Sequence, residues 1–206
     1  MKNIYLILIF FPISVFCQNF DLNTVQKINA ARFKKADKTL DILSSSADYT
    51  AVASPLIILA TGYAKNDTEL KQKGLNMAVG VIGTYGVGYI LKSTVNRKRP
   101  YEIDPKIQNY RIENDSSFPS GSTSLAFTNA TNLTIAFPKW YVAVPAYAYA
   151  TGVGYARLHL GAHFPTDVLA GAAIGTASAF ISRSLNNALR NKIRKRYIKR
   201  AQRIEE

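Results

Sequence analysis

The sequence has few of the side chains that bind metals or form disulfides. Its 206 residues include two histidines and one cysteine, Cys17. If residues 1–17 are removed as a signal peptide, the mature chain has no cysteine. That would exclude a disulfide, a thiolate metal site and a cysteine nucleophile. The sequence also gives no sign of a metal site, a nucleotide-binding loop or a repeat.

Residues 1–17 are typical of a signal peptide. Lys2 precedes an apolar run from Ile4 to Phe16, which is short for a bilayer span, and the expected cut lies ahead of Gln18. A lipoprotein site at Cys17 is the competing interpretation, but the bulky residue before that cysteine disfavours it. The signal predicts export across a membrane.

Acidic residues are half as numerous as basic ones, 13 against 26, and the net charge is +13. Basic residues gather at 65–73, at Lys139 and in the tail 183–206. The tail could bind nucleic acid. A basic tail that follows a membrane span more often sets topology and contacts anionic lipids, so we expect membrane lipids and no nucleic acid as partners.

None of the apolar segments of the sequence shows the period-two alternation of a half-buried strand. Hydrophobic residues make up 48% of the chain. They concentrate in segments rich in alanine, glycine and leucine, whose small residues let helices approach closely. We predict five helices, at Tyr49–Ala64, Gly74–Leu91, Thr123–Phe137, Tyr141–Tyr155 and Val168–Ser182.

The predicted fold class is all-α, a bundle of about five core helices embedded in a membrane. The segments of roughly 15–18 residues lie at or below the usual spanning length of about 17–25. We expect an amphipathic helix in a polar segment 18–48, a helical domain at 49–182 and a basic tail at 183–206. Five crossings after an exported N-terminus place the basic regions on the cytoplasmic side. Loops 92–122 and 156–167 then share the outer face.

Both histidines lie in the second of these loops. Pro165 predicts a helix start just after His163, which puts Asp167 in the first turn, where an acid is favoured. A carboxylate that holds one imidazole nitrogen leaves the other free to act as a nucleophile or base. The same pattern also fits an ordinary helix-start acid beside a loop histidine.

The first outer loop begins with a pair of cations. Lys92 and Arg99 are seven residues apart, so on a helix they share one face, and Pro100 then turns the chain. Such a pair could clamp an anion. It could also be a basic helix end, since Arg97 and Lys98 lie between the two.

The same loop ends at a second predicted helix start. Pro119, Ser120 and Gly121 would present free backbone N–H groups, which bind phosphate well, although a serine-capped helix looks the same in sequence. Together with Arg157, these pieces supply three cations, N–H donors and an oriented histidine. That combination suits phosphoryl transfer.

The motifs resemble those of the type 2 phosphatidic acid phosphatases, which share a fold with the vanadium haloperoxidases. The family's Lys, six residues, Arg-Pro motif matches Lys92 to Pro100, and its Pro-Ser-Gly-His motif corresponds to 119–122. Its Ser-Arg, five residues, His, three residues, Asp motif matches at Arg157, His163 and Asp167. The resemblance covers roughly residues 49–182.

The resemblance implies a role for each matched residue. His163 would attack phosphorus and form a phosphohistidine, Asp167 would orient it, and water would then release phosphate. No metal or cofactor would be needed. The phosphate oxygens would be bound by Lys92, Arg99, Ser120, Gly121 and Arg157.

Two positions depart from the family pattern. Ala156 replaces a serine, and Ser122 replaces the histidine that protonates the leaving group. The chain could therefore be a non-catalytic relative, or His159 or a carboxylate of the 102–115 loop could supply the proton. A third interpretation is that the leaving group needs little acid. A diphosphate fits, because the phosphate it expels has a pKa of roughly 6–7 by analogy with phosphoserine.

The leading hypothesis is a phosphatase at the outer, periplasmic face of a bacterial-type inner membrane. It would act on a lipid phosphate or diphosphate, such as an undecaprenyl carrier or a lipid A headgroup. A soluble periplasmic acid phosphatase and a headgroup-binding protein without catalysis are the alternatives. A haloperoxidase is disfavoured because it would need vanadate and the same missing histidine.

Overall fold

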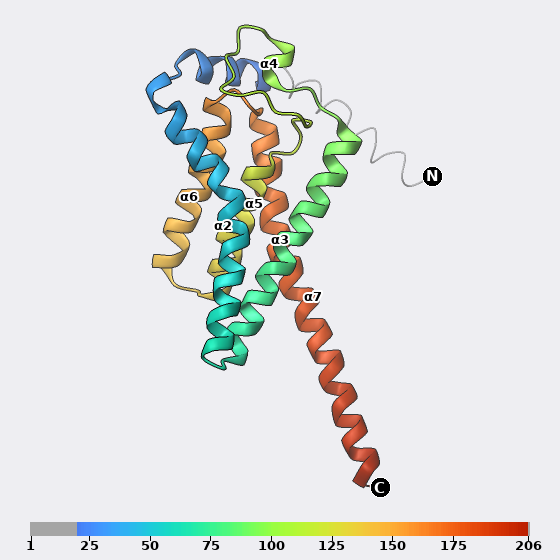
Figure 1. Cartoon of the computed structure of the whole chain (residues 1–206). Coiled ribbons are helices and arrows are strands. Elements are labelled where there is room, and N and C mark those ends of the chain that lie inside the picture. The colour runs from blue at the N-terminus through green and yellow to red at the C-terminus, as the bar shows by residue number, and fades with distance from the viewer. Residues whose placement is uncertain (1–19, 206) are drawn as a thin grey trace, which may run out of the picture.

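The computed structural model describes residues 20–205, with the side chains of 193 and 195–205 excepted. The predicted signal peptide, residues 1–17, lies outside this range. All regular structure within 20–205 is helical, as predicted (Figure 1). A helix over residues 20–30 comes first. It is followed by η1 (Lys34–Ala36), α2 (Asp37–Ala64), α3 (Thr68–Val95), α4 (Pro100–Ile103), α5 (Gly121–Ala136), α6 (Trp140–His159) and α7 (Pro165–Glu205).

The five long helices coincide with the five predicted apolar segments, but most of them are longer. The N-terminal segment 18–48 contains the expected helix, at 20–30, yet α2 already begins at Asp37. The early start is possible because the first turns of α2 bury small residues such as Ser44 and Ala47 on one face. At the other end, the basic tail continues α7 without a break to Glu205.

Helix α5 lies at the centre of the bundle and contacts α2, α3, α6 and α7. Glycines in α7 allow a very close approach. A Cβ on Gly175 would lie 2.1 Å from the Ser124 carbonyl oxygen, and one on Gly171 would lie 2.7 Å from that of Ser120. This packing fixes the N-terminal turn of α5 against the N-terminal turns of α7. Asn129 and Asn132 of α5 are buried among the helices, as expected for an interior helix.

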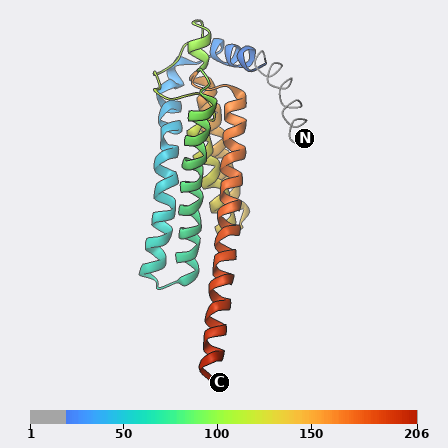
Figure 2. The ribbon, with the colours of Figure 1, turned by 90° about the vertical axis from the view of Figure 1, so that its right-hand side faces the viewer.

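Three helical stretches, Lys34–Ala64, Thr68–Ile103 and Pro165–Lys192, are long and apolar enough to cross a membrane. Their outer faces expose large apolar side chains, including Ile57, Ile82 and Phe180. These features make the chain an integral membrane protein. The loop between α3 and α5 and the turn between α6 and α7 gather at one end of the bundle, and the helix at 20–30 lies across that end (Figures 1 and 2). We call it the loop end.

Candidate active site

Most of the predicted site residues line one cavity at the loop end. The cavity has a volume of about 310 Å³, which is at the small end of the range for ligand sites. Ser120 and Asp167 lie outside its lining. The predicted residues that line it are Lys92, Arg99, Gly121, Ser122, Arg157 and His163.

His163 lies in the short turn between α6 and α7, and only 2% of its surface is exposed. Its Nδ1 is 2.7 Å from the carbonyl oxygen of Ser117. Because a carbonyl only accepts hydrogen bonds, this contact assigns the proton to Nδ1 and leaves Nε2 unprotonated. Nε2 lies 3.4 Å from Nη1 of Arg99, beside the cations of the cavity.

The environment keeps His163 neutral. Burial lowers its pKa to about 4, and the guanidinium groups of Arg157 and Arg99 act in the same direction. The nearby carboxylate of Asp167 opposes the shift without cancelling it. A neutral imidazole with an unprotonated Nε2 is the form that can act as a nucleophile at pH 7.

Asp167 does not hold the imidazole directly. Its Oδ2 is 3.7 Å from Nδ1 of His163, which is too long for a hydrogen bond. Ser117 links the two residues instead, because its hydroxyl donates to Asp167 Oδ2 at 2.5 Å while its carbonyl accepts from His163. The expected orientation of His163 by Asp167 is therefore indirect.

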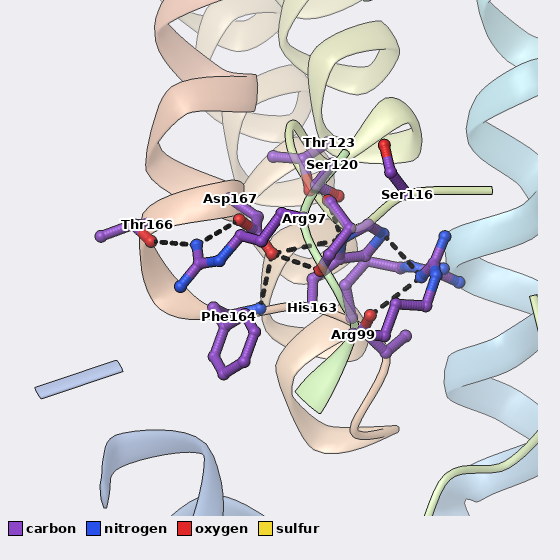
Figure 3. Close-up of polar contacts among 12 residues, drawn as sticks. Arg97, Arg99, Ser116, Ser120, Thr123, His163, Phe164, Thr166 and Asp167 are labelled. Carbon is purple, nitrogen blue, oxygen red and sulfur yellow. Dashed lines mark hydrogen bonds and ion pairs between the residues drawn. The ribbon is translucent and has the colours of Figure 1, made fainter. Parts of the chain in front are cut away.

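Arg97, like Ser117, is a residue of the site that the sequence analysis did not identify. It was expected only as part of a basic helix end, but its Nη1 donates to Asp167 Oδ1 at 2.6 Å (Figure 3). Arg97 and Ser117 thus each hold one oxygen of the buried Asp167 carboxylate. Arg97 lies inside the Lys92 to Pro100 motif and Ser117 lies two residues before the 119–122 motif, and these positions are the signal that could have drawn attention to them.

The three predicted cations converge on the cavity, but acids of the 104–120 loop already pair with them. Arg157 Nη2 lies 2.6 Å from Glu113 Oε1, and Lys92 Nζ lies 3.1 Å from Asp115 Oδ2. Arg99, which is 1% exposed, pairs with both acids. The carboxylates engage the groups that would otherwise bind an anionic ligand.

These ion pairs set the charge of the two acids. Burial alone would raise the pKa of Glu113, but Arg157 and Arg99 outweigh it and hold that pKa at about 2. Burial would likewise raise the pKa of Asp115, but Lys92 and Arg99 outweigh burial and hold that pKa below its usual value. Both carboxylates are ionised at neutral pH.

The N-terminus of α5 presents its backbone to the cavity through Gly121 and Ser122. The first N–H groups of a helix have no partner within it, so these two amides can bind an anion. Ser120 is placed differently from the expectation. Its hydroxyl is 2.9 Å from the Thr123 hydroxyl and its N–H donates to the Asp167 carbonyl. Ser120 therefore links the start of α5 to the start of α7 and does not face the cavity.

His159 is not in a position to replace the missing proton donor. It ends α6 with 4% of its surface exposed, its Nε2 is 3.3 Å from Asp37 Oδ1, and it does not line the cavity. Ser122, Glu113 and Asp115 do line it.

Comparisons with known proteins agree with this architecture. The model of the PAP2 superfamily matches residues 73–190. Among curated proteins, the chain is similar to an undecaprenyl-diphosphatase of Sulfolobus acidocaldarius, with 28% identity over 110 residues, 53% of each chain. It is also similar to the bacitracin transport permease protein BcrC of Bacillus licheniformis, with 36% identity over 97 residues, 45% of each chain. The chain thus spans about half the length of the curated relatives it matches.

Two solved structures share the fold. The crystal structure of Aquifex aeolicus LpxE aligns with a TM-score of 0.70 and 28% identity, covering 80% of this chain and 95% of that one. A transmembrane PAP2 type phosphatidylglycerolphosphate phosphatase from Bacillus subtilis aligns with a TM-score of 0.72 and 23% identity, covering 91% of this chain and 96% of that one. The second likeness concerns the fold alone.

Proposed function

The chain belongs to the PAP2 superfamily, and on this premise we propose that it is a membrane-embedded lipid phosphatase that works through a phosphohistidine. One observation carries the proposal. His163 has its proton on the Nδ1 side, donated to Ser117, and its unprotonated Nε2 lies 3.4 Å from Nη1 of Arg99 at a cavity lined by Lys92, Arg99 and Arg157. A neutral nucleophile beside three cations matches the needs of phosphoryl transfer.

In the proposed reaction, the cations and the amides of Gly121 and Ser122 bind the phosphate oxygens. His163 Nε2 forms a bond to phosphorus while the bond from phosphorus to the leaving oxygen breaks, and the electron pair stays on that oxygen. Water then attacks phosphorus, the N–P bond breaks and its electron pair returns to Nε2. Inorganic phosphate leaves, and Nδ1 keeps its proton throughout.

We further propose that the substrate is a lipid diphosphate, such as an undecaprenyl carrier or a lipid A headgroup. Ser122 has no useful acidity near pH 7, and Glu113 is held ionised by Arg157 and Arg99. Such a site suits a leaving group that needs little protonation, and a departing phosphate is far less basic than an alkoxide. The similarity to a protein named as an undecaprenyl-diphosphatase points in the same direction.

We propose that the active site faces outward, towards the periplasm of a bacterial-type cell. The lysines at 65–73 lie at the turn between α2 and α3, Lys139 lies between α5 and α6, and α7 ends in a basic stretch. These regions lie at the end of the bundle opposite the loop end (Figure 1). Basic regions remain on the cytoplasmic side, so this distribution supports an outward site.

Phosphate release by the purified protein in detergent tests the proposal. Undecaprenyl diphosphate is compared with phosphatidate for the natural chain and for His163→Ala, with His159→Gln as a control for loss of the other histidine. We expect release from the diphosphate that vanishes in His163→Ala and persists in His159→Gln. Equal turnover of phosphatidate would refute the diphosphate preference, and activity in His163→Ala would refute the phosphohistidine.

A second candidate function follows from Ser122, which occupies the cavity where a general acid would be useful. A chain that kept its phosphate pocket but lost catalysis would bind phosphate headgroups. No release from either lipid, followed by a gain of activity on Ser122→His, would mean that the chain kept its phosphate pocket and gave up catalysis.

A further inference from the structure

The helix at 20–30 covers the loop end of the bundle, lying across it in Figure 2. It buries one stripe of residues, Asp21, Val25 and Asn29, spaced four apart and therefore on one face. Val25 packs with Ile107 and Phe164, and Asn29 pairs with the backbone of Gln108. A charged residue heads this otherwise uncharged stripe.

Asp21 is 1% exposed, and its carboxylate contacts Arg97 and Thr166. Its Oδ1 accepts from the Thr166 N–H at 3.1 Å. Its Oδ2 accepts from Arg97 Nη2 at 2.7 Å and from the Thr166 hydroxyl. Because a buried carboxylate is costly unless it is paired, these contacts fix the start of the helix to the start of α7.

Arg97 joins this carboxylate to the one behind the nucleophile. While Nη2 binds Asp21, Nη1 donates to Asp167 Oδ1 at 2.6 Å and to the Thr166 hydroxyl at 2.8 Å (Figure 3). The guanidinium carbon also lies 4.1 Å from the centre of the Phe164 ring. One arginine therefore sits between two buried carboxylates and against the residue that follows His163.

The connection continues to the imidazole. Asp167 Oδ2 accepts from the Phe164 N–H at 3.0 Å and from the Ser117 hydroxyl at 2.5 Å, and the Ser117 carbonyl accepts from His163 Nδ1. A continuous row of hydrogen bonds and ion pairs thus runs from the helix at 20–30 to the proposed nucleophile.

We propose that Asp21 and Arg97 are positioning residues of the phosphatase, which makes the helix at 20–30 a working part of the active site. Neither residue lines the cavity. Their effect is to hold Thr166, Asp167 and Ser117 in place, so that His163 Nε2 stays aimed at the phosphate. This inference rests on the proposed catalytic role of His163.

The test compares Asp21→Asn with a matched control on the same helix, in full-length protein in detergent. Asp21→Asn removes the charge and retains the shape. The control is Gln26→Leu, which breaks the 2.6 Å hydrogen bond from Gln26 to Asp104, the residue that follows α4. This change leaves the contacts of Arg97 and Thr166 intact. Thr166→Val, which removes only the hydroxyl between Asp21 and Arg97, serves as an independent variant with both charges intact.

We expect kcat on undecaprenyl diphosphate to fall roughly 10- to 100-fold in Asp21→Asn, and less in Thr166→Val, because small displacements of a reacting group carry such penalties. KM should change less than about threefold, since Asp21 lies outside the cavity. Gln26→Leu should behave as the natural chain.

The acid limb of the pH profile gives a readout that a loss of stability alone would not move. A loosened turn admits water to His163, which relaxes the burial that holds its pKa near 4 among Arg99, Arg157 and Asp167. The acid limb of kcat/KM should therefore move to higher pH in Asp21→Asn and not in Gln26→Leu.

The outcomes separate this inference from the proposed function. An inactive natural chain refutes the function and the inference with it. An active natural chain, an inactive His163→Ala and an unchanged Asp21→Asn refute the positioning role alone. So would an equal loss in Gln26→Leu, or a failure of both Asp21→Asn and Thr166→Val to fold, since either result would make the contacts structural only.

Discussion

The carboxylate of Glu113 occupies groups that the substrate phosphate must use, so we predict that Glu113→Gln tightens phosphate binding. Oε1 lies 2.6 Å from Arg157 Nη2, and Oε2 lies 3.6 Å from Arg99 Nη2. An incoming phosphate has to displace this carboxylate. Glutamine keeps the shape but removes the charge that competes.

The pKa of Glu113 sets the size of the effect. Holding it at about 2 against a usual 4.5 corresponds to about 3.4 kcal/mol of favourable interaction. The side chain remains partly open to water, which screens the ion pairs, so we take about 1–2 kcal/mol as the part that competes with substrate. The inhibition constant of inorganic phosphate should then fall roughly 5- to 30-fold.

Competitive inhibition of lipid turnover by added phosphate at pH 7 measures this constant, with the product lipid quantified. Asp104→Asn is the matched control. It makes the same charge change on the same loop, but Asp104 does not line the cavity, so its constant should not move. An inhibition constant for phosphate that is unchanged or higher in Glu113→Gln would refute the reasoning. A fall in kcat that is confined to poor leaving groups would instead identify Glu113 as the proton donor.

Three further predictions concern the leaving group, the histidine and the helix packing. Ser122→His should raise turnover of a lipid monoester, by up to about 10²–10⁴-fold, and change diphosphate turnover little; equal gains would contradict the leaving-group argument. The pKa of His163 is about 4, below its unfolded value near 6.5, so the unfolded chain takes up the proton first. Stability is then full above pH 6.5 and declines towards pH 4, with a loss of about 2 kcal/mol at pH 5. Thermal unfolding at pH 7 and pH 5 should show this loss in the natural chain and not in His163→Gln. Gly175→Ala places a Cβ 2.1 Å from the Ser124 carbonyl oxygen and should cost about 1–3 kcal/mol, whereas Gly86→Ala meets nothing within 4 Å and should be neutral or mildly stabilising in the same unfolding assay.

The helices were predictable because their composition changes sharply along the chain. Runs of alanine, glycine and leucine without alternation can only be helical in this setting, and all five were found. An amphipathic helix was expected within 18–48, whereas the structure divides this segment among the helix at 20–30, η1 and the first turns of α2, which begins at Asp37.

The cavity was predictable to the extent that its residues lie in short motifs. The spacing of Lys92, Arg99, Arg157 and His163 sufficed, because the bundle brings their two loops to one end. The supporting residues were not predictable in this way. Arg97 meets Asp167 across 70 positions and Asp21 meets Thr166 across 145, and no local periodicity encodes such contacts.

The length of helix α7 makes the orientation of the protein in the membrane measurable. Its 41 residues extend about 60 Å, roughly twice the thickness of the hydrocarbon core of a bilayer. It begins beside His163 and runs past the turn between α2 and α3 (Figure 1). A reporter enzyme fused behind α7 would thus be carried clear of the lipid on the side opposite the cavity. Its activity in one compartment would reveal which side the nucleophile faces, without altering any residue of the site.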